Sequence, residues 1–306
     1  MDILTTIIPI FTIIILGCLA QRKGFLPPEF LNPANRLVYH IAIPALIFNA
    51  ISQTTISRQL NPPVIALMLV AAIGAYAVAW LTATGMGLPL SQRGTYVQCA
   101  AHGNLGYIGL AVAYYFMGDD GLTRAGVAAG FLMILQNLMS VIVLQAYSFA
   151  DRTHKPGSRL IVKVFGNPVI LSAMAGILFS LIGLTLPLVL RRSLEILSGM
   201  ALPTALLLIG ATLSFELIYK YLKIVLSVAV IKLVALPLIG LMLFSAFNVP
   251  VSDYMPVLIL LASPTATIAY VMAKEMQGDP DVAVAAISAL TLFSAVSFTF
   301  WLHLAA

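Results

Sequence analysis

Polar side chains and glycines gather halfway along an apolar segment, at a depth where a lipid-facing helix would contain leucine. The run from Cys99 to Gly109 contains three glycines together with His102 and Asn104. Glycine weakens a helix, so the run predicts an interruption midway along a membrane span. An amide can donate a hydrogen bond to a carboxylate, and a helix end pointing to the membrane centre adds positive charge. His102, Gly103 and Asn104 are therefore candidate binding residues.

A second apolar segment is interrupted in the same way. It contains Ser263-Pro264-Thr265-Ala266-Thr267, and a proline removes one backbone hydrogen bond and clashes with the preceding turn. Unwound backbone inside a membrane is tolerated only where it lines a cavity, and paired interruptions mark a transporter's binding site. The alternative is two simple kinks, with the glycines allowing close packing and the hydroxyls relieving the proline bend. The matching positions favour a functional crossing and add Pro264, Thr265 and Thr267 to the candidates.

Other polar residues inside apolar segments leave two interpretations open. Asn49, Gln136 and Asn137 either contact a ligand or bridge helices, and bridging is the commoner role of such amides. Lys232 lies near the centre of a span, where burying a charge is costly, so it either serves function or pairs with backbone carbonyls at a broken helix end. His102 taken alone is more typical of a hydrogen-bonded interior residue than of a proton carrier.

Catalytic and metal-binding patterns are missing from the sequence. None of the 11 acidic residues lies at the centre of an apolar segment, so neither a buried proton relay nor a charged sodium site is visible, although hydroxyls and carbonyls could still bind sodium. The four histidines are scattered, and both cysteines lie in apolar runs. We therefore expect no enzyme, no cofactor and no metal. The histidines are His40, His102, His154 and His303, and the cysteines are Cys18 and Cys99.

The composition places these residues in a membrane protein. Of 306 residues, 61% are hydrophobic and only 9% are charged, far below the roughly 25% charged residues of a soluble domain. At roughly 30 residues for each span and its connection, the chain accommodates about ten transmembrane helices. The basic residues lie in connections without a cluster interleaved with aromatics, so no nucleic acid partner is expected. The predicted spans are residues 2–20, 33–51, 63–85, 94–117, 122–148, 165–184, 188–213, 220–244, 253–276 and 280–304.

An internal repeat divides the chain at its longest polar stretch, Asp151 to Arg159. At an offset of 159 residues several prolines and glycines coincide, and the first, second and fourth spans fall on the sixth, seventh and ninth. We expect repeats at 1–150 and 164–306 with a cytoplasmic linker at 151–163. Because five is odd, the second repeat enters from the opposite face. The coinciding pairs are Pro9 with Pro168, Pro28 with Pro187, Pro44 with Pro203, Gly17 with Gly176, and Asp120 with Asp279.

The distribution of basic residues predicts the orientation. Connections after odd-numbered spans contain 11 lysines and arginines and the others contain 4, and cytoplasmic connections carry the excess. Both termini are therefore expected outside the cytoplasm, in a multi-pass protein of the inner cell membrane. The first apolar run has no basic segment before it, and we expect it to remain as the first helix. The four basic residues on the side expected to lie outside the cytoplasm are Arg58, Arg124, Arg191 and Arg192.

Three motifs resemble the auxin efflux carrier family of bacterial and plant membrane transporters. Gly103 to Gly109 resembles its fourth-helix glycine-asparagine motif, Ala201 to Leu213 its seventh helix, and Pro264 to Glu275 its ninth. The family usually has a proline near the position of Ala111, which this chain lacks, and the long central loop of plant members is absent. The resemblance covers the whole chain.

The resemblance implies a fold and a mechanism. It implies ten helices in two inverted repeats, with helices 4 and 9 broken and crossing. Helices 1, 2, 6 and 7 would form a scaffold, and helices 3–5 and 8–10 a moving unit. It also implies that a substrate carboxylate is held near the crossing, partly by the asparagine that matches Asn104.

The leading hypothesis is therefore a secondary transporter in the lipid bilayer that exports a small organic anion, either auxin-like or a dicarboxylate, by an elevator-type alternating-access mechanism. We also expect a homodimer formed through the scaffold helices. An ion channel would need a continuous polar pore, and no ring or stripe of charged residues suggests one. A membrane sensor would bind the ligand without flux.

Overall fold

The computed structural model describes residues 3–53, 61–147 and 168–305, and these residues form helices. The predicted linker at 151–163 lies outside the described residues. Apart from one isolated bridge, no strand occurs in the described part of the chain. The elements are α1 (Ile3–Arg22), α2 (Pro28–Leu37), η1 (Val38–Ala42), α3 (Ile43–Ser52), α5 (Pro62–Gly85), α6 (Leu90–Ala101), η2 (Leu105–Gly109), α7 (Leu110–Tyr147), α9 (Pro168–Leu181), α10 (Leu188–Gly199), α11 (Ala201–Ala211), α12 (Phe215–Lys220), α13 (Leu222–Ala229), η3 (Val230–Ala235), α14 (Leu236–Ala246), α15 (Val251–Ala262), α16 (Ile268–Glu275) and α17 (Pro280–Ala305), where η marks a π-helical segment.

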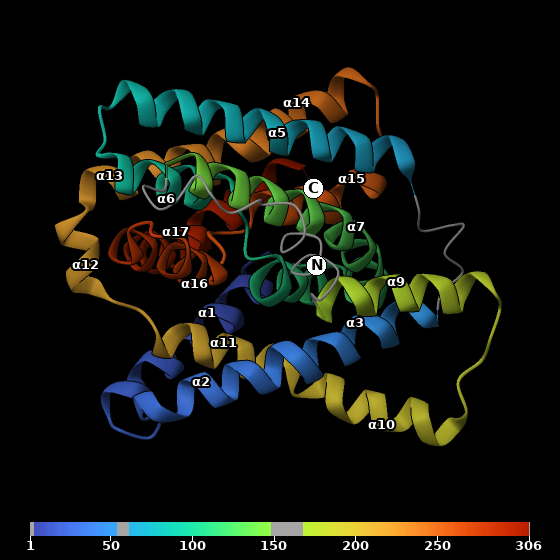
Figure 1. Ribbon diagram of the computed structural model, residues 1–306. Coiled ribbons are helices and arrows are strands. Elements are labelled where there is room, and N and C mark those ends of the chain that lie inside the picture. Colours follow the sequence, from blue (N-terminus) through green and yellow to red (C-terminus); the bar gives the residue numbers. More distant parts are fainter. Residues whose placement is uncertain (1–2, 54–60, 148–167, 306) are drawn as a thin grey trace.

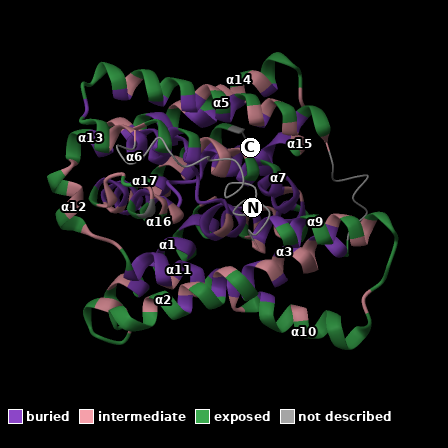
Figure 2. Ribbon diagram, in the orientation of Figure 1, coloured by how far each residue is buried: buried purple, intermediate pink, exposed green. Residues whose placement is uncertain are grey.

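The helices form a bundle whose centre holds the interrupted segments. Figure 1 shows α2, α3, α10 and α11 along one side of the bundle and α5, α13 and α14 along the other, with α6, α7, α16 and α17 between them. The outer helices expose one face (Figure 2), whereas residues 94–101 of α6 and 254–262 of α15, which lead into the interruptions, are all buried. The central segments are therefore shielded by the bundle, which is the position that a site inside the membrane requires.

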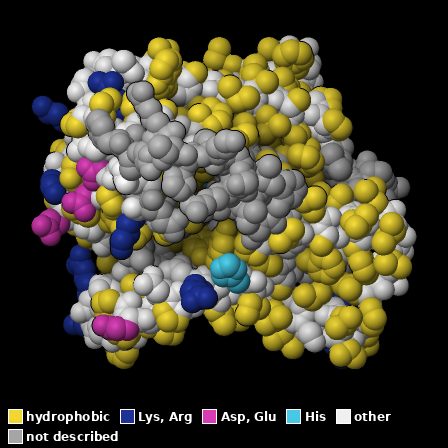
Figure 3. Space-filling model, in the orientation of Figure 1, with side chains coloured by type: hydrophobic (Ala, Val, Ile, Leu, Met, Phe, Trp, Pro, Cys, Tyr) yellow, Lys and Arg dark blue, Asp and Glu magenta, His cyan; other side chains and the backbone are white. Residues whose placement is uncertain are grey.

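The surface of the bundle is apolar where a membrane would cover it. Large hydrophobic side chains such as Ile8, Leu81 and Val296 are exposed, and charged side chains in Figure 3 lie mostly along the edge near α12 and α13. An exposed apolar surface of this extent fits lipid as the surrounding solvent.

Seven helices among the described residues are long and apolar enough to cross a membrane, compared with ten predicted spans. Part of the difference has a physical cause, because α6 and α15 end at the two interruptions and are therefore short; α9 is described only from Pro168 onward. In addition, the chain from Leu105 to Tyr147 counts as one helix although it bends at Gly118. Gly118 has φ 69°, a left-handed conformation that glycine adopts without strain, and it lies where the sequence predicts a connection between two spans.

Polar contacts at both ends hold the central helices in position. At one end Arg124 contacts Asp120 at 2.9 Å and Asp253 at 3.6 Å, and Asn61 donates to Asp253 at 3.1 Å. These contacts join α7, α15 and the start of α5. At the other end Gln92 of α6 donates to Asp279 at 3.0 Å.

Candidate functional site

Two interruptions meet at the centre of the bundle. The chain leaves α6 after Ala101 and re-enters a helix at Leu105, and it leaves α15 after Ala262 and re-enters at Ile268. Gly103 and Thr265 form an antiparallel bridge. Its two hydrogen bonds run from the Asn104 N–H to the Pro264 carbonyl, at 2.7 Å, and from the Ala266 N–H to the His102 carbonyl, at 2.9 Å. The interruptions therefore form one paired crossing.

Hydroxyl groups satisfy part of the backbone that the crossing leaves free. The Thr265 hydroxyl donates to the Cys99 carbonyl at 2.7 Å, and the Ser263 hydroxyl donates to the Ile259 carbonyl at 3.0 Å. Buried carbonyls without a partner would be costly. Thr265 thus links the second interruption to the end of α6.

Asn104 places an unpaired donor at the crossing. Its Oδ1 accepts a hydrogen bond from the Tyr107 N–H at 3.2 Å and so caps the N-terminal end of η2. Its Nδ2 is buried and has no hydrogen-bond partner in the described structure, and the residue as a whole is only 5% exposed. Leaving a buried donor unpaired costs about 1–3 kcal/mol, so a ligand that accepts from Nδ2 would recover that free energy.

The N-terminal end of α16 lies at the same crossing. Its N-cap residue is Thr267, which is partly exposed and makes no side-chain capping bond. Helix N-termini carry partial positive charge from their free N–H groups. Two such ends, of η2 and of α16, point to the crossing, and this arrangement favours an anion.

The C-terminal ends of the broken helices are capped from neighbouring helices. Gln136 of α7 donates through Nε2 to the carbonyl of Ala101, the last residue of α6, at 3.2 Å. Lys232 of η3 donates to the carbonyl of Leu261, in the last turn of α15, at 2.8 Å. Lys232 therefore pairs with a backbone carbonyl at a broken helix end, which is one of the two interpretations that the sequence leaves open.

His102 belongs to a buried polar network behind the crossing. Its Nδ1 lies 2.8 Å from the Ser140 hydroxyl, which lies 3.1 Å from the Tyr76 hydroxyl. Tyr76 also donates to the Gln136 carbonyl at 3.1 Å. Sequence reasoning missed Tyr76 and Ser140, although Ser140 follows Gln136 by four residues and so shares its helix face.

Two predicted residues are placed differently. Asn49 of α3 accepts from Gln53 through Oδ1 at 2.7 Å, and no bond between its side chain and the crossing is found among the described residues. Asn137 is partly exposed, and no hydrogen bond of its side chain is found there either. A contact that the sequence did not suggest joins the Tyr107 hydroxyl of η2 to Asn35 of α2 at 3.4 Å.

No group of three or more His, Cys, Asp and Glu side chains suited to a metal ion occurs among the described residues.

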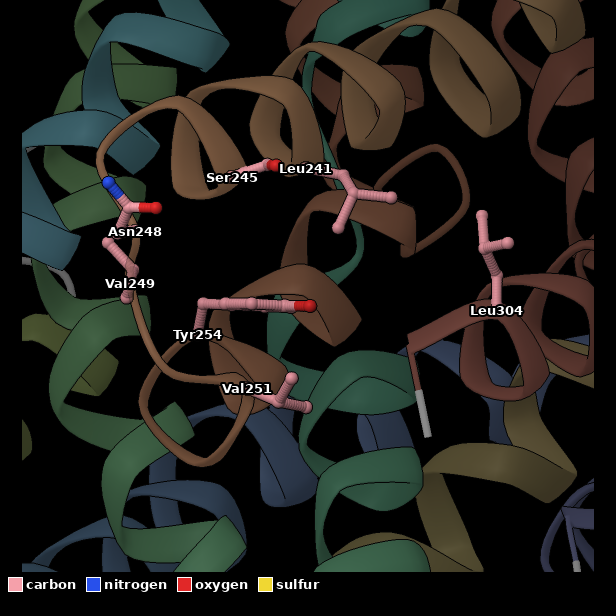
Figure 4. A pocket seen from close by; sticks show the side chains of 7 residues that line it. All are labelled: Leu241, Ser245, Asn248, Val249, Val251, Tyr254 and Leu304. Atoms are coloured by element: carbon pink, nitrogen blue, oxygen red, sulfur yellow. The ribbon is translucent and has the colours of Figure 1, made fainter.

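A surface pocket of about 510 Å³ lies away from the crossing, where α14 meets α15, beside the end of α17, as Figure 4 shows. Its lining includes Leu241, Tyr254 and Leu304 and contains no charged side chain. At the crossing, by contrast, the unpaired donor of Asn104 lies beside two helix ends.

Known membrane transporters resemble this chain over nearly its whole length. The family described as membrane transport protein matches residues 2–302. A Rhizobium meliloti protein named "Putative malonate transporter" is 26% identical over 315 residues, covering 99% of this chain and 96% of the relative. Uncharacterized transporters of Methanothermobacter thermautotrophicus and Methanocaldococcus jannaschii are 28% and 22% identical over 97% and 95% of this chain, and over 96% and 95% of their own lengths.

Proposed function

Because the chain belongs to the membrane transport protein family, the family of the auxin efflux carriers, we propose that it carries a small organic carboxylate across the membrane by alternating access. The resemblance that the three motifs suggested is confirmed by the match over residues 2–302. The protein is a membrane transporter. The substrate, the mechanism and the direction are the proposal.

The unpaired Nδ2 of Asn104 carries the proposal. It is a buried donor beside the N-terminal ends of η2 and α16, and Thr267 leaves the second of these ends without a side-chain cap. A carboxylate oxygen would accept from Nδ2 while its charge meets the helix ends. Gly103, Pro264 and Thr265 form the backbone wall of this site, because they pair the two interrupted segments.

The other polar residues take supporting roles in the proposal. Lys232 and Gln136 stabilise the C-terminal ends of α15 and α6, and His102 anchors the crossing to α7 through Ser140. Asn49 of α3 becomes a substrate contact only if the crossing moves toward α3 in another state, and Asn137 of α7 only if α7 rotates relative to the crossing. A dicarboxylate is the favoured substrate class, because a relative that matches nearly the full chain is named for malonate.

A ten-helix inverted repeat is supported by matching helix crossings. A Cβ on Gly17 of α1 would overlap the Leu207 backbone of α11, and a Cβ on Gly176 of α9 would lie 3.5 Å from the Phe48 carbonyl oxygen of α3. The offset of 159 carries Gly17 to Gly176 and Phe48 to Leu207. The same contact between the two halves thus occurs twice, with the roles of the halves exchanged.

In the proposed elevator mechanism the scaffold consists of α1, α2–α3, α9 and α10–α11. The moving unit contains the remaining helices and carries the crossing. Side-chain bonds that join the two within the described residues include Tyr107 to Asn35, Thr6 to the Tyr115 carbonyl at 3.3 Å, and Thr123 to the Ala50 carbonyl at 3.4 Å. These three are neutral hydrogen bonds, which a sliding interface can exchange at small cost.

The proposal includes export across the inner membrane, with both termini outside the cytoplasm. It also includes a homodimer formed through the scaffold. Apolar side chains of α10 project from the scaffold, with Val189 75% and Ile196 77% exposed. A second copy would find such a surface complementary, as would lipid. Chemical crosslinking in native membranes distinguishes a dimer from a monomer.

Transport of malonate by the purified protein in liposomes tests the proposed function. We expect uptake of labelled malonate that saturates with concentration and is accelerated by unlabelled malonate inside the vesicles, because a carrier exchanges its substrate. Single-channel currents would instead indicate a channel. Saturable malonate binding without any flux would indicate a sensor.

A further inference from the structure

We propose that Lys232 selects the substrate by charge: its ammonium group acts through Gly103 on an anion bound at Asn104, so the site prefers a dianion to a monoanion of the same shape. This inference rests on the proposed anion site. It assigns Lys232 a role in specificity beyond stabilising α15.

The Lys232 amine is buried, and in its protonated form it is a charge without a carboxylate partner. The side chain is 0% exposed, and it makes no ion pair within the described residues. One of its three N–H groups donates to the Leu261 carbonyl at 2.8 Å. A carbonyl is neutral, so the charge itself is not compensated. Buried charges are normally paired with an opposite charge, which the protein does not provide here.

Gly103 allows this charge to lie directly behind the crossing. A Cβ on Gly103 would be 3.3 Å from the Lys232 Nζ and 3.4 Å from its Cε, which is a tight contact. Any larger side chain would therefore push the ammonium group away. Gly103 is also the neighbour of Asn104, whose unpaired Nδ2 marks the proposed anion position. Lys232 thus lies against the residue next to the one that carries the proposed anion donor.

The attraction between the Lys232 ammonium group and a bound anion is large enough to select between ligands. For two unit charges roughly 7 Å apart at an effective dielectric constant of about 20, the attraction corresponds to a change in affinity on the order of 50-fold. The effect grows with ligand charge, so the factor for a dianion is about the square of the factor for a monoanion. Screening by salt is weak because the group is buried.

A purely structural role predicts a different pattern. If Lys232 only caps α15, then removing it disturbs the crossing for every ligand alike. The affinities of a dianion and a monoanion would fall by the same factor. The comparison between two ligands of one shape therefore distinguishes the two roles.

The test uses malonate, which carries two charges at neutral pH, and malonamate, which has nearly the same shape and carries one. Their dissociation constants are measured on the purified full-length protein in nanodiscs. Lys232→Gln is the main variant, because its amide can still donate to the Leu261 carbonyl but has no charge. Lys232→Met is the second neutral variant. Lys223→Gln is the matched control, since Lys223 lies on the preceding turns of the same segment and is exposed.

We expect wild type to bind malonate at least about tenfold more tightly than malonamate. In Lys232→Gln, or in Lys232→Met if the first variant does not fold, the loss of malonate affinity should be about the square of the loss for malonamate. Lys223→Gln should change neither. Equal losses for both ligands, or tighter binding of malonamate by wild type, would overturn the inference while leaving the anion site intact. If wild type binds neither ligand, the proposed function itself fails and the inference fails with it.

Discussion

At the scale of single residues, the chemistry of the crossing depends on which polar atoms remain unpaired. Asn104 uses its Oδ1 to cap η2 and leaves its buried Nδ2 without a partner, whereas His102, Gln136 and Lys232 each make a hydrogen bond to a protein atom. The Asn104 Nδ2 is therefore a donor that a carboxylate can engage without breaking an existing bond.

Substitution of Asn104 tests this assignment. Asn104→Ala removes the donor, and Asn104→Asp keeps the volume but adds a negative charge where the anion should bind. We expect the Asp variant to transport malonate less well than the Ala variant at neutral pH, and acidification to rescue Asp partly but not Ala, because protonation removes the repulsion. An Asp variant as active as wild type in liposomes would place the anion elsewhere.

Gln136 and Asn137 form a matched pair of neighbouring amides. Gln136→Leu leaves the Ala101 carbonyl without its donor, and we expect a loss of stability of about 1–3 kcal/mol. Asn137→Leu breaks no hydrogen bond seen in the described structure and should leave stability nearly unchanged. Thermal unfolding of the two variants in detergent measures the difference. Equal melting temperatures would show that Gln136 is not needed to cap α6.

Sequence reasoning identified the residues of the crossing but not the network behind it. Glycines, an amide and a proline at the centre of apolar spans are unfavourable there, so their presence signals a special role. Tyr76 and Ser140 give no such signal, because a tyrosine or serine is unremarkable in a membrane helix and its partner lies on another helix. The capping role of Lys232 was one of two open interpretations, and only the position of the Leu261 carbonyl relates it to α15.

At the scale of helices, close packing between α1 and α11 fixes the part of the bundle that would form the scaffold. Gly17 and Gly210 allow the two backbones to approach, because a Cβ on either would overlap the backbone of the other helix. The interruption after α6 also forms without the family proline near Ala111, which lies one residue beyond the start of α7. Glycine and the paired backbone of α15–α16 are therefore sufficient to stop the helix at His102.

A pair of glycine substitutions tests the helix packing. Gly17→Ala should destabilise the protein, because the added methyl group overlaps the Leu207 backbone, which cannot move away as a side chain could. Gly74→Ala in α5 has no atom within 4 Å of the added Cβ and should stabilise by about 0.5–1 kcal/mol, since alanine favours the helix. Unfolding curves give both signs. A Gly17→Ala protein as stable as wild type would contradict the packing of α1 on α11.

At the scale of the whole molecule, the exposed apolar surface and the charged residues near the helix ends fit a protein that spans a lipid bilayer. The composition alone predicted the membrane class, because 9% charged residues cannot cover a soluble protein of 306 residues. The number of spans was harder to predict, since hydropathy does not distinguish a continuous helix from two halves that meet at a break. The described helices α6, α15 and α16 show this, each having at most 12 residues.

Cysteine labelling tests the predicted orientation. In a variant with Cys18 and Cys99 replaced by alanine, Arg192→Cys should react with an impermeant maleimide added outside intact cells, and Lys23→Cys should react only after lysis. Both positions are exposed. The expectation follows from the excess of basic residues on the cytoplasmic side. The reverse pattern would contradict the predicted topology.

The most direct test of the central claim is the location of a bound dicarboxylate. In crystals of the protein with bromomalonate, the anomalous scattering of bromine would locate the ligand directly. We predict one strong peak beside the Asn104 amide and the first turn of α16. A peak at another place in the molecule, with none at the crossing, would contradict the account.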